Sequence, residues 1–114
     1  MTSYTPAQGD IIFMDFNPTK GREQKGLRPA LVVSTAEYYN KTKLLIVCPV
    51  SNTSSAFPLH LKLDQRTKTT GAILTQHIRT IDPDVRNVSF VEVAPTDILL
   101  SVLNRVGLFF IHNQ

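Results

Sequence analysis

The chain has 114 residues, of which 42% are hydrophobic and 18% are charged. This length predicts one folded domain, residues 1–114, and the composition argues against a disordered chain. A net charge of +3, from 12 Lys/Arg against 9 Asp/Glu, permits a polyanionic partner without requiring one. Cys48 is the single cysteine, which excludes an internal disulfide and a cysteine metal cluster. No apolar run reaches the roughly 18 residues of a membrane span.

The first half of the chain predicts three short strands. Residues 10–16 are rich in β-favouring side chains, and this run ends at the turn-forming pair Asn17-Pro18. Residues 19–27 are polar, charged and glycine-containing, which is typical of a loop. Arg28 precedes Pro29 and is therefore biased towards extended backbone, so it should stand at the entrance of a buried strand over residues 29–33. A polar turn or short helix at 35–42 leads to a third strand at 43–50 and a polar loop at 51–55.

The second half predicts further strands and one helix. Residues 57–63 alternate between apolar and polar side chains, the period of a half-buried strand, and short strands are expected at 71–75, 77–81 and 87–94. Residues 82–84 predict a turn. Pro95 is well placed to open a helix, and Gly107 to stop it. The helix should bury one face, formed by Leu99, Val102, Leu103 and Val106. Many short strands without βαβ alternation predict a mainly β or α+β domain, such as a compact antiparallel barrel.

A longer pattern spans Gly9 to Ser34, in which GD, an apolar run, DF, NPTKG, EQ and RPALVVS follow one another. This pattern resembles the opening of MazF/PemK toxins. The likeness covers most of the chain and is strong at its start and weak after Ile81. The later segments that fit are Pro49-Val50-Ser51, Phe57-Pro58, Gly71 and Arg79-Thr80-Ile81.

The resemblance implies a small SH3-like antiparallel barrel with a C-terminal helix, a homodimer, and neutralisation by a cognate antitoxin protein. It also implies cleavage of single-stranded RNA at short sequence sites, in which the RNA's own 2′-hydroxyl attacks and leaves 2′,3′-cyclic phosphate and 5′-hydroxyl ends. No metal or other cofactor is implied, and the scattered carboxylates of this sequence agree. We expect a cytoplasmic protein with no membrane contact, because the N-terminal residues have no basic segment followed by an apolar run.

The resemblance implies roles in the reaction for three residues, which are Arg28, Glu23 and Ser51. Arg28 suits the phosphate, because its planar donor fork matches phosphate oxygens and stays charged. Glu23 is expected either to accept the 2′-hydroxyl proton or to hold Arg28 in place. Ser51 stands where the family carries a threonine or serine, and its hydroxyl could bond a phosphate oxygen; otherwise it is a strand-end residue.

The sequence departs from part of the family at Leu74 and Gln76. Some relatives carry an arginine and an aspartate there, proposed as acid/base groups, whereas neither side chain here can exchange protons. His77 is a possible substitute, with a structural role as the alternative. His60 and His112 are expected at the surface.

Recognition of single-stranded RNA usually uses stacking and hydrogen bonds to base edges. Phe16 and Phe57 could stack, but both lie in apolar strand patterns and are expected in the core. We expect RNA contacts from polar and basic side chains of the loops and strand ends: Asn17, Thr19, Lys20, Arg22, Lys25, Asn52, Thr53, Gln76 and Arg79.

Two other functions compete with RNA cleavage. The fold class also includes non-enzymatic poisons resembling CcdB, which bind a protein target such as DNA gyrase, and fold alone does not fix function. Leu74 and Gln76 also allow a relative that binds RNA but has lost catalysis. The motif that contains Glu23 and Arg28 favours the ribonuclease.

Overall fold

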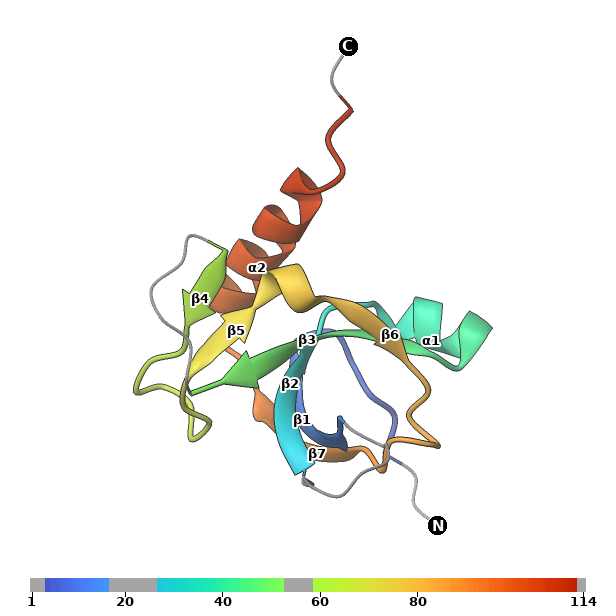
Figure 1. Cartoon of the computed structure of the whole chain (residues 1–114). Helices are drawn as coiled ribbons and strands as arrows, with labels where there is room; N and C mark the ends of the chain where they lie inside the picture. Colours follow the sequence, from blue (N-terminus) through green and yellow to red (C-terminus); the bar gives the residue numbers. More distant parts are fainter. Residues whose placement is uncertain (1–3, 17–26, 53–58, 113–114) are drawn as a thin grey trace.

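One antiparallel sheet forms the body of the molecule, with a long helix against it (Figure 1). The structure is a computed structural model that describes residues 4–16, 27–52 and 59–112. The strands are β1 (Asp10–Asp15), β2 (Leu27–Val32), β3 (Leu45–Ser51), β4 (His60–Lys62), β5 (Ala72–Leu74), β6 (Arg79–Ile81) and β7 (Ser89–Val93). The helices are α1 (Ala36–Thr42), the 3-10 turn η1 (Thr75–His77) and α2 (Thr96–Leu108). The strand order is β4-β5-β3-β2-β1-β7, and β6 pairs with β3 off this path.

The predicted α+β class with an antiparallel sheet and a C-terminal helix is confirmed. The sheet curls, but in the described part of the chain no pairing joins β4 to β7 to close a barrel. The prediction that Gly107 stops α2 was wrong. Gly107 has no positive φ, so the helix runs through it to Leu108. The strand expected at 77–81 begins only at Arg79, because residues 75–77 form η1.

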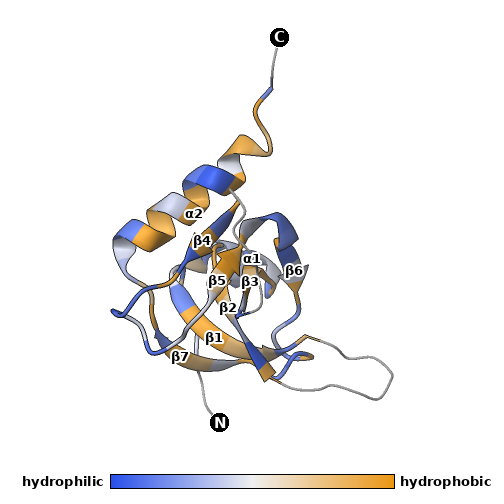
Figure 2. Ribbon diagram, turned by 60° about the vertical axis from the view of Figure 1, so that its left-hand side comes forward, coloured by the Kyte–Doolittle hydropathy of each residue, from blue (hydrophilic) through white to orange (hydrophobic). Residues whose placement is uncertain are grey.

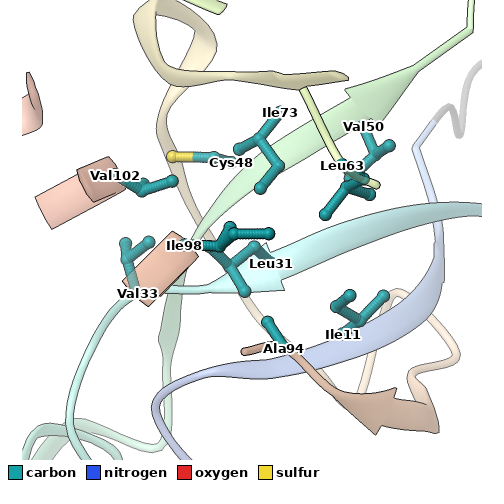
Figure 3. Close-up of a cluster of buried hydrophobic side chains, with 10 residues drawn as sticks. All are labelled: Ile11, Leu31, Val33, Cys48, Val50, Leu63, Ile73, Ala94, Ile98 and Val102. Atoms are coloured by element: carbon teal, nitrogen blue, oxygen red, sulfur yellow. The ribbon is translucent and has the colours of Figure 1, made fainter. Parts of the chain in front are cut away.

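The central strands are buried on both faces, which explains their nearly continuous apolar runs. Neighbouring residues such as Leu31 and Val32 point into different clusters. The first cluster lies under α2 and is drawn in Figure 3: Ile11, Leu31, Val33, Cys48, Val50, Leu63, Ile73, Ala94, Ile98 and Val102. The second lies on the other side of the strands: Ile12, Met14, Ala30, Val32, Leu45, Val47 and Ile81. β1 is accordingly coloured as mostly hydrophobic in Figure 2.

Helix α2 covers the first cluster with the face that the sequence predicts. Val102 is fully buried, and the partly buried Leu99, Leu103 and Val106 pack beside it. Ile98 joins this face as well. Among the described residues, no helix combines the length and the apolar character needed to cross a membrane.

Strand β3 changes its partner halfway along one edge. Val47 pairs with Arg79 of β6, whereas Val50 pairs with Ile73 of β5. The short turn η1 connects β5 to β6 and therefore passes over the two residues of β3 between these pairs. On its other edge β3 pairs with β2. We call this point, where the edge of β3 passes from β6 to β5, the fork of β3. It brings ends of β3, β5 and β6 close to the turn η1.

Gly71 provides a test of how tightly this region is packed. Its φ is +113°, and a Cβ at this position would lie 2.6 Å from the Ser51 carbonyl oxygen. We expect Gly71→Ala to lower the free energy of unfolding by about 2 kcal/mol or more, because both the backbone conformation and the contact oppose a side chain. The control Gly107→Ala adds its methyl in open space on a helix and should raise this free energy by about 0.5 kcal/mol. Urea denaturation measures both, and similar effects at the two sites would contradict the packing.

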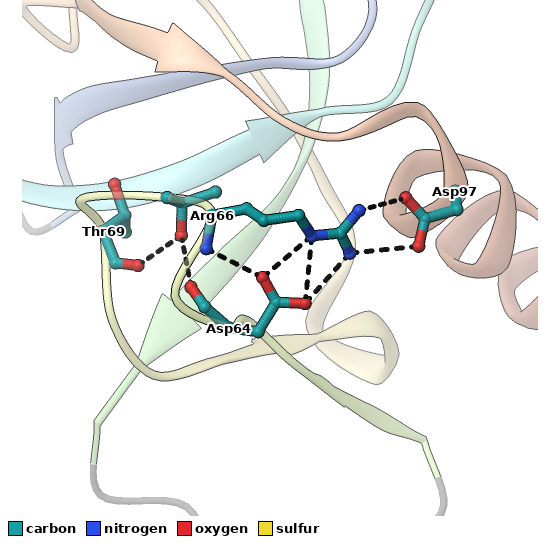
Figure 4. A network of polar contacts seen from close by, with 5 residues as sticks. Asp64, Arg66, Thr69 and Asp97 are labelled. Atoms are coloured by element: carbon teal, nitrogen blue, oxygen red, sulfur yellow. Dashed lines mark hydrogen bonds and ion pairs between the residues drawn. The ribbon is translucent and has the colours of Figure 1, made fainter.

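An ion-pair network ties the segment after β4 to the rest of the fold (Figure 4). The Arg66 guanidinium donates to Asp97 Oδ1 at 2.9 Å and to Asp64 Oδ2 at 2.9 Å. Glu92 of β7 accepts from the backbone N–H of Thr69 at 2.8 Å and from its hydroxyl at 2.7 Å. Residues 64–70 are thereby attached to the first turn of α2 and to β7.

The network predicts a pH-dependent stability. Hydrogen bonds from Arg66 hold the pKa values of Asp64 and Asp97 below their usual range. A lowered folded-state pKa gives stability that is present above the unfolded pKa, about 4, and is lost as the pH falls through the folded values. Arg66→Met should therefore destabilise the protein near neutral pH, and the deficit should shrink at about pH 3. Thermal unfolding of both proteins measures this. The control Lys41→Met removes the exposed Lys41–Glu37 pair and should leave the thermal stability almost unchanged at either pH. A loss of stability in Arg66→Met that is equal at both pH values would contradict the role of the network.

Candidate active site

An open pocket of about 520 Å³ lies at the fork of β3. It is bounded by the end of β1, the start of β2, the end of β3, η1 and the start of β6. Its lining residues are Phe16, Arg28, Pro49, Val50, Ser51, Leu74, Gln76, His77, Ile78 and Arg79.

Sheet register brings Arg28 and Ser51 together. Ala30 and Pro49 form the last described pair of the β2–β3 ladder, and the same register continued by two positions on each strand would bring Arg28 opposite Ser51. Side chains opposite each other on neighbouring strands lie on the same face of a sheet. Arg28 is exposed at the start of β2, as predicted, so its guanidinium is accessible to a ligand.

The turn η1 is anchored by Thr75, whose side chain is fully buried. The Thr75 hydroxyl donates to the Leu59 carbonyl oxygen at 2.6 Å, and the N–H of Ile78 donates to the Thr75 carbonyl at 3.3 Å. These bonds fix the two following side chains at the pocket. Gln76 is partly buried there and His77 is exposed.

Gln76 contacts a histidine that the sequence suggested was a surface residue. Its Nε2 lies 2.9 Å from Nε2 of His60, and His60 is half-buried. The register explains this, because His60 pairs with Leu74 across β4 and β5 and so reaches the start of η1. Among the described residues, Oε1 of Gln76 is buried with no hydrogen-bond partner. Neither Leu74 nor Gln76 supplies an acid or a base to the pocket.

Phe16 is partly buried against the second cluster, in line with its apolar pattern, and it also lines the pocket. The alternation along β1 explains both contacts. Phe16 follows Met14 on the face of the second cluster, but it lies just beyond the last residue of β1 and so reaches the rim. The Arg79 guanidinium carbon lies 5.5 Å from the centre of the Phe16 ring, a distance typical of cation–π contact. The pocket therefore contains an aromatic ring with a cation over it.

Several predicted site residues are brought together and others are not. The lining of the pocket includes Arg28, Ser51, His77, Gln76 and Arg79. Asn52 is exposed beside it but does not line it, and its Oδ1 accepts from the Thr70 hydroxyl at 3.1 Å. Seven predicted residues lie outside the described part of the chain: Asn17, Thr19, Lys20, Arg22, Glu23, Lys25 and Thr53.

Metal and thiol chemistry have no candidate group in the described ranges. Among those residues, no three or more His, Cys, Asp and Glu side chains are grouped as metal ligands. Burial raises the pKa of the Cys48 thiol to about 12, so this cysteine stays protonated inside the first cluster.

Residues 7–110 match the profile of the PemK-like, MazF-like toxins of type II toxin-antitoxin systems. The chain belongs to this family. It is 37% identical to the endoribonuclease toxin MazF of Escherichia coli K12 over 81 residues, which cover 71% of this chain and 72% of that protein. It is 34% identical to the endoribonuclease PemK of Escherichia coli over 104 residues, covering 88% of this chain and 78% of that one. A MazE–MazF crystal structure from Deinococcus radiodurans superposes with a TM-score of 0.86 at 34% identity, covering 94% and 96% of the two chains.

Arg86 is a residue near the pocket that the sequence did not single out. Its Nη1 donates to the carbonyl oxygens of Asp15 and Phe16, at 3.2 and 3.1 Å. No local pattern marks Arg86, because its partners lie about 70 positions away in the chain. The position of Phe16 directly before the turn-forming pair Asn17-Pro18 is the signal that could have indicated its place at a strand end.

Proposed function

We propose that this chain is a metal-independent endoribonuclease toxin that cleaves single-stranded RNA. The observation that carries the proposal is the convergence of Arg28, Ser51 and His77 on one open pocket in a member of this toxin family. Relatives at 37% and 34% identity are endoribonucleases by name, which supports the same activity here.

The proposed reaction is an internal transesterification. The 2′-oxygen forms a bond to the adjacent phosphorus as it loses its proton, and the bond from phosphorus to the 5′-oxygen of the next nucleotide breaks as that oxygen gains a proton. The products are a 2′,3′-cyclic phosphate and a 5′-hydroxyl. Negative charge gathers on the non-bridging oxygens in the transition state. We assign Arg28 to these oxygens, with the Ser51 hydroxyl as a further donor.

Proton transfer needs a base at the 2′-oxygen and an acid at the 5′-oxygen. We assign one of these roles to His77, since Leu74 and Gln76 cannot perform either. Glu23 keeps its two alternatives, which are to accept the 2′-hydroxyl proton or to hold Arg28 in place.

We assign base contacts to Arg79 and Phe16 through stacking and to Gln76 through its amide. We propose a similar role for Asn52, which is exposed and follows the pocket residue Ser51. The remaining RNA contacts are proposed from the family motif alone: Asn17, Thr19, Lys20, Arg22, Lys25 and Thr53.

We further propose a homodimer that is inhibited by a cognate antitoxin, in keeping with the MazE–MazF complex of Deinococcus radiodurans. An acidic, flexible antitoxin segment would block a cationic pocket by charge and shape. We also propose a cytoplasmic location, where a toxin of this kind would meet cellular RNA.

The Arg28 assignment is tested by cleavage of a long single-stranded RNA in EDTA. Wild-type protein should cleave it, and 5′-end mapping should reveal 5′-hydroxyl ends at short sequence sites. Arg28→Ala should reduce kcat by about 100- to 1,000-fold, and Arg28→Lys by less, because lysine keeps the charge but loses the planar fork. Lys41→Ala, an exposed cation on α1, is the control and should retain full activity. Loss of wild-type cleavage in the chelator, or full activity of Arg28→Ala, would contradict the mechanism.

The His77 assignment is tested by a pH–rate profile. His77→Asn should lower kcat by about 100-fold or more and remove one limb of the profile, because one proton-transfer group is gone. His112→Asn, an exposed histidine near the C-terminal end, is the control. If the profile of His77→Asn keeps the wild-type shape, His77 plays no part in proton transfer.

The same assays decide the alternative that Leu74 and Gln76 suggest. A protein that binds RNA but yields no cleavage products would be a relative that has lost catalysis.

A further inference from the structure

We propose that Arg86 is a positioning residue for RNA binding, which holds Phe16 in place as the surface on which a nucleobase stacks. The inference rests on the proposed function in that a nucleotide enters the pocket. Arg86 itself does not line the pocket and acts through the main chain of Phe16.

The contacts of Arg86 converge on the end of β1. Its Nη1 donates to the Asp15 carbonyl oxygen at 3.2 Å and to the Phe16 carbonyl oxygen at 3.1 Å. The backbone N–H of Asp15 in turn donates to the Arg86 carbonyl oxygen at 2.8 Å. Hydrogen bonds from a charged donor are stronger than those between neutral groups. Arg86 therefore fixes this stretch of main chain from outside the β-ladder.

The turn that carries Arg86 is itself well ordered by hydrogen bonds. The Asp82 carbonyl oxygen accepts from the N–H groups of Val85 at 3.0 Å and Arg86 at 3.1 Å. The Asp82 carboxylate accepts from the N–H of Asp84 at 3.0 Å, and Asn87 takes a left-handed conformation with φ +58° before the chain enters β7. This turn presents Arg86 from a fixed backbone, and the side chain is half-buried.

Among the described residues, Phe16 lies one position beyond the end of β1, where its ring packs against the second cluster and Arg86 holds its main chain. The pairing of β1 with β2 ends at Asp15 opposite Leu27. The ring of Phe16 nevertheless lies at the pocket, with the Arg79 guanidinium carbon 5.5 Å from its centre. Stacking of a base on an aromatic side chain contributes about 1–3 kcal/mol and depends on where the ring lies. By binding the Phe16 carbonyl oxygen, Arg86 thus keeps the ring of Phe16 in the position where a base would stack.

The test compares binding by Arg86→Met, Arg86→Lys and a matched control, Arg66→Met. The probe is a 2′-O-methyl RNA of mixed sequence, which lacks the attacking hydroxyl and cannot be cleaved. Arg86→Met should raise the Kd about fivefold to tenfold. Arg86→Lys should recover part of the affinity, since an ammonium can still donate to both carbonyl oxygens. Arg66→Met removes an arginine network outside the pocket, so it should lower the Tm and leave the Kd unchanged.

A double-mutant cycle separates positioning from general stability. If Arg86 acts through Phe16, Arg86→Met combined with Phe16→Leu should bind no more weakly than Phe16→Leu alone. The inference would be overturned if the fold-increases in Kd of the two single variants multiply in the double variant. It would also be overturned if Arg86→Met and Arg66→Met have the same Kd. If the wild-type protein binds the probe but cleaves no unmodified RNA, the proposed function is contradicted. The Kd values of the variants would still decide whether Arg86 positions Phe16. Wild-type protein that neither binds nor cleaves would contradict both.

Discussion

Pro49 has no backbone N–H, and it stands in β3 where the strand changes partner. The N–H of Val33 donates to the Ile46 carbonyl, so the even-numbered residues of β3 direct their backbone groups towards β2. The missing donor of Pro49 therefore belongs to the opposite edge, where Val47 pairs with β6 and Val50 pairs with β5. A proline in a central strand normally removes a ladder bond. Here it falls where the edge passes from one partner to the next, and the pocket opens at that point.

Among the described residues, the fork places positive charge in the pocket lining without a carboxylate beside it. Arg28 and Arg79 both line the pocket, and the described lining residues include no Asp or Glu. The fold keeps its carboxylates elsewhere, since Glu92 and Asp97 bind residues of the segment after β4. Such an arrangement attracts a polyanion although the net charge of the whole chain is small. Arg28 and Ser51 both belong to strands, because Arg28 is the second residue of β2 and Ser51 is the last residue of β3, so the position of each backbone is set by the sheet.

Sequence reasoning succeeded where the signal is local. The bias of Arg28 towards extended backbone before Pro29, the one-sided apolar face of α2 and the burial of Cys48 all depend on neighbours in the chain. It failed where distant segments decide. Phe16 packs against the second cluster as its β1 pattern predicts, but nothing in that pattern indicates that it also lines a pocket.

The contact between His60 and Gln76 is another feature that the sequence did not predict. The alternation of apolar and polar residues along a strand cannot reveal which other strand lies beside it. The extension of α2 through Gly107 shows a related limit, because glycine permits a helix stop without imposing one.

The geometry of η1 supports the proposal that His77 takes a proton-transfer role in this chain. A 3-10 turn has three residues per turn, so its successive side chains point in three directions. Thr75 points into the core, Gln76 towards His60, and His77 outwards at the pocket. An amide at position 76 cannot pass a proton on from His60. Within the described lining of the pocket, His77 is consequently the side chain whose chemistry suits proton exchange. Under the proposed function, the departure from the family at Leu74 and Gln76 would shift proton transfer by one residue and leave the phosphate contact at Arg28 unchanged.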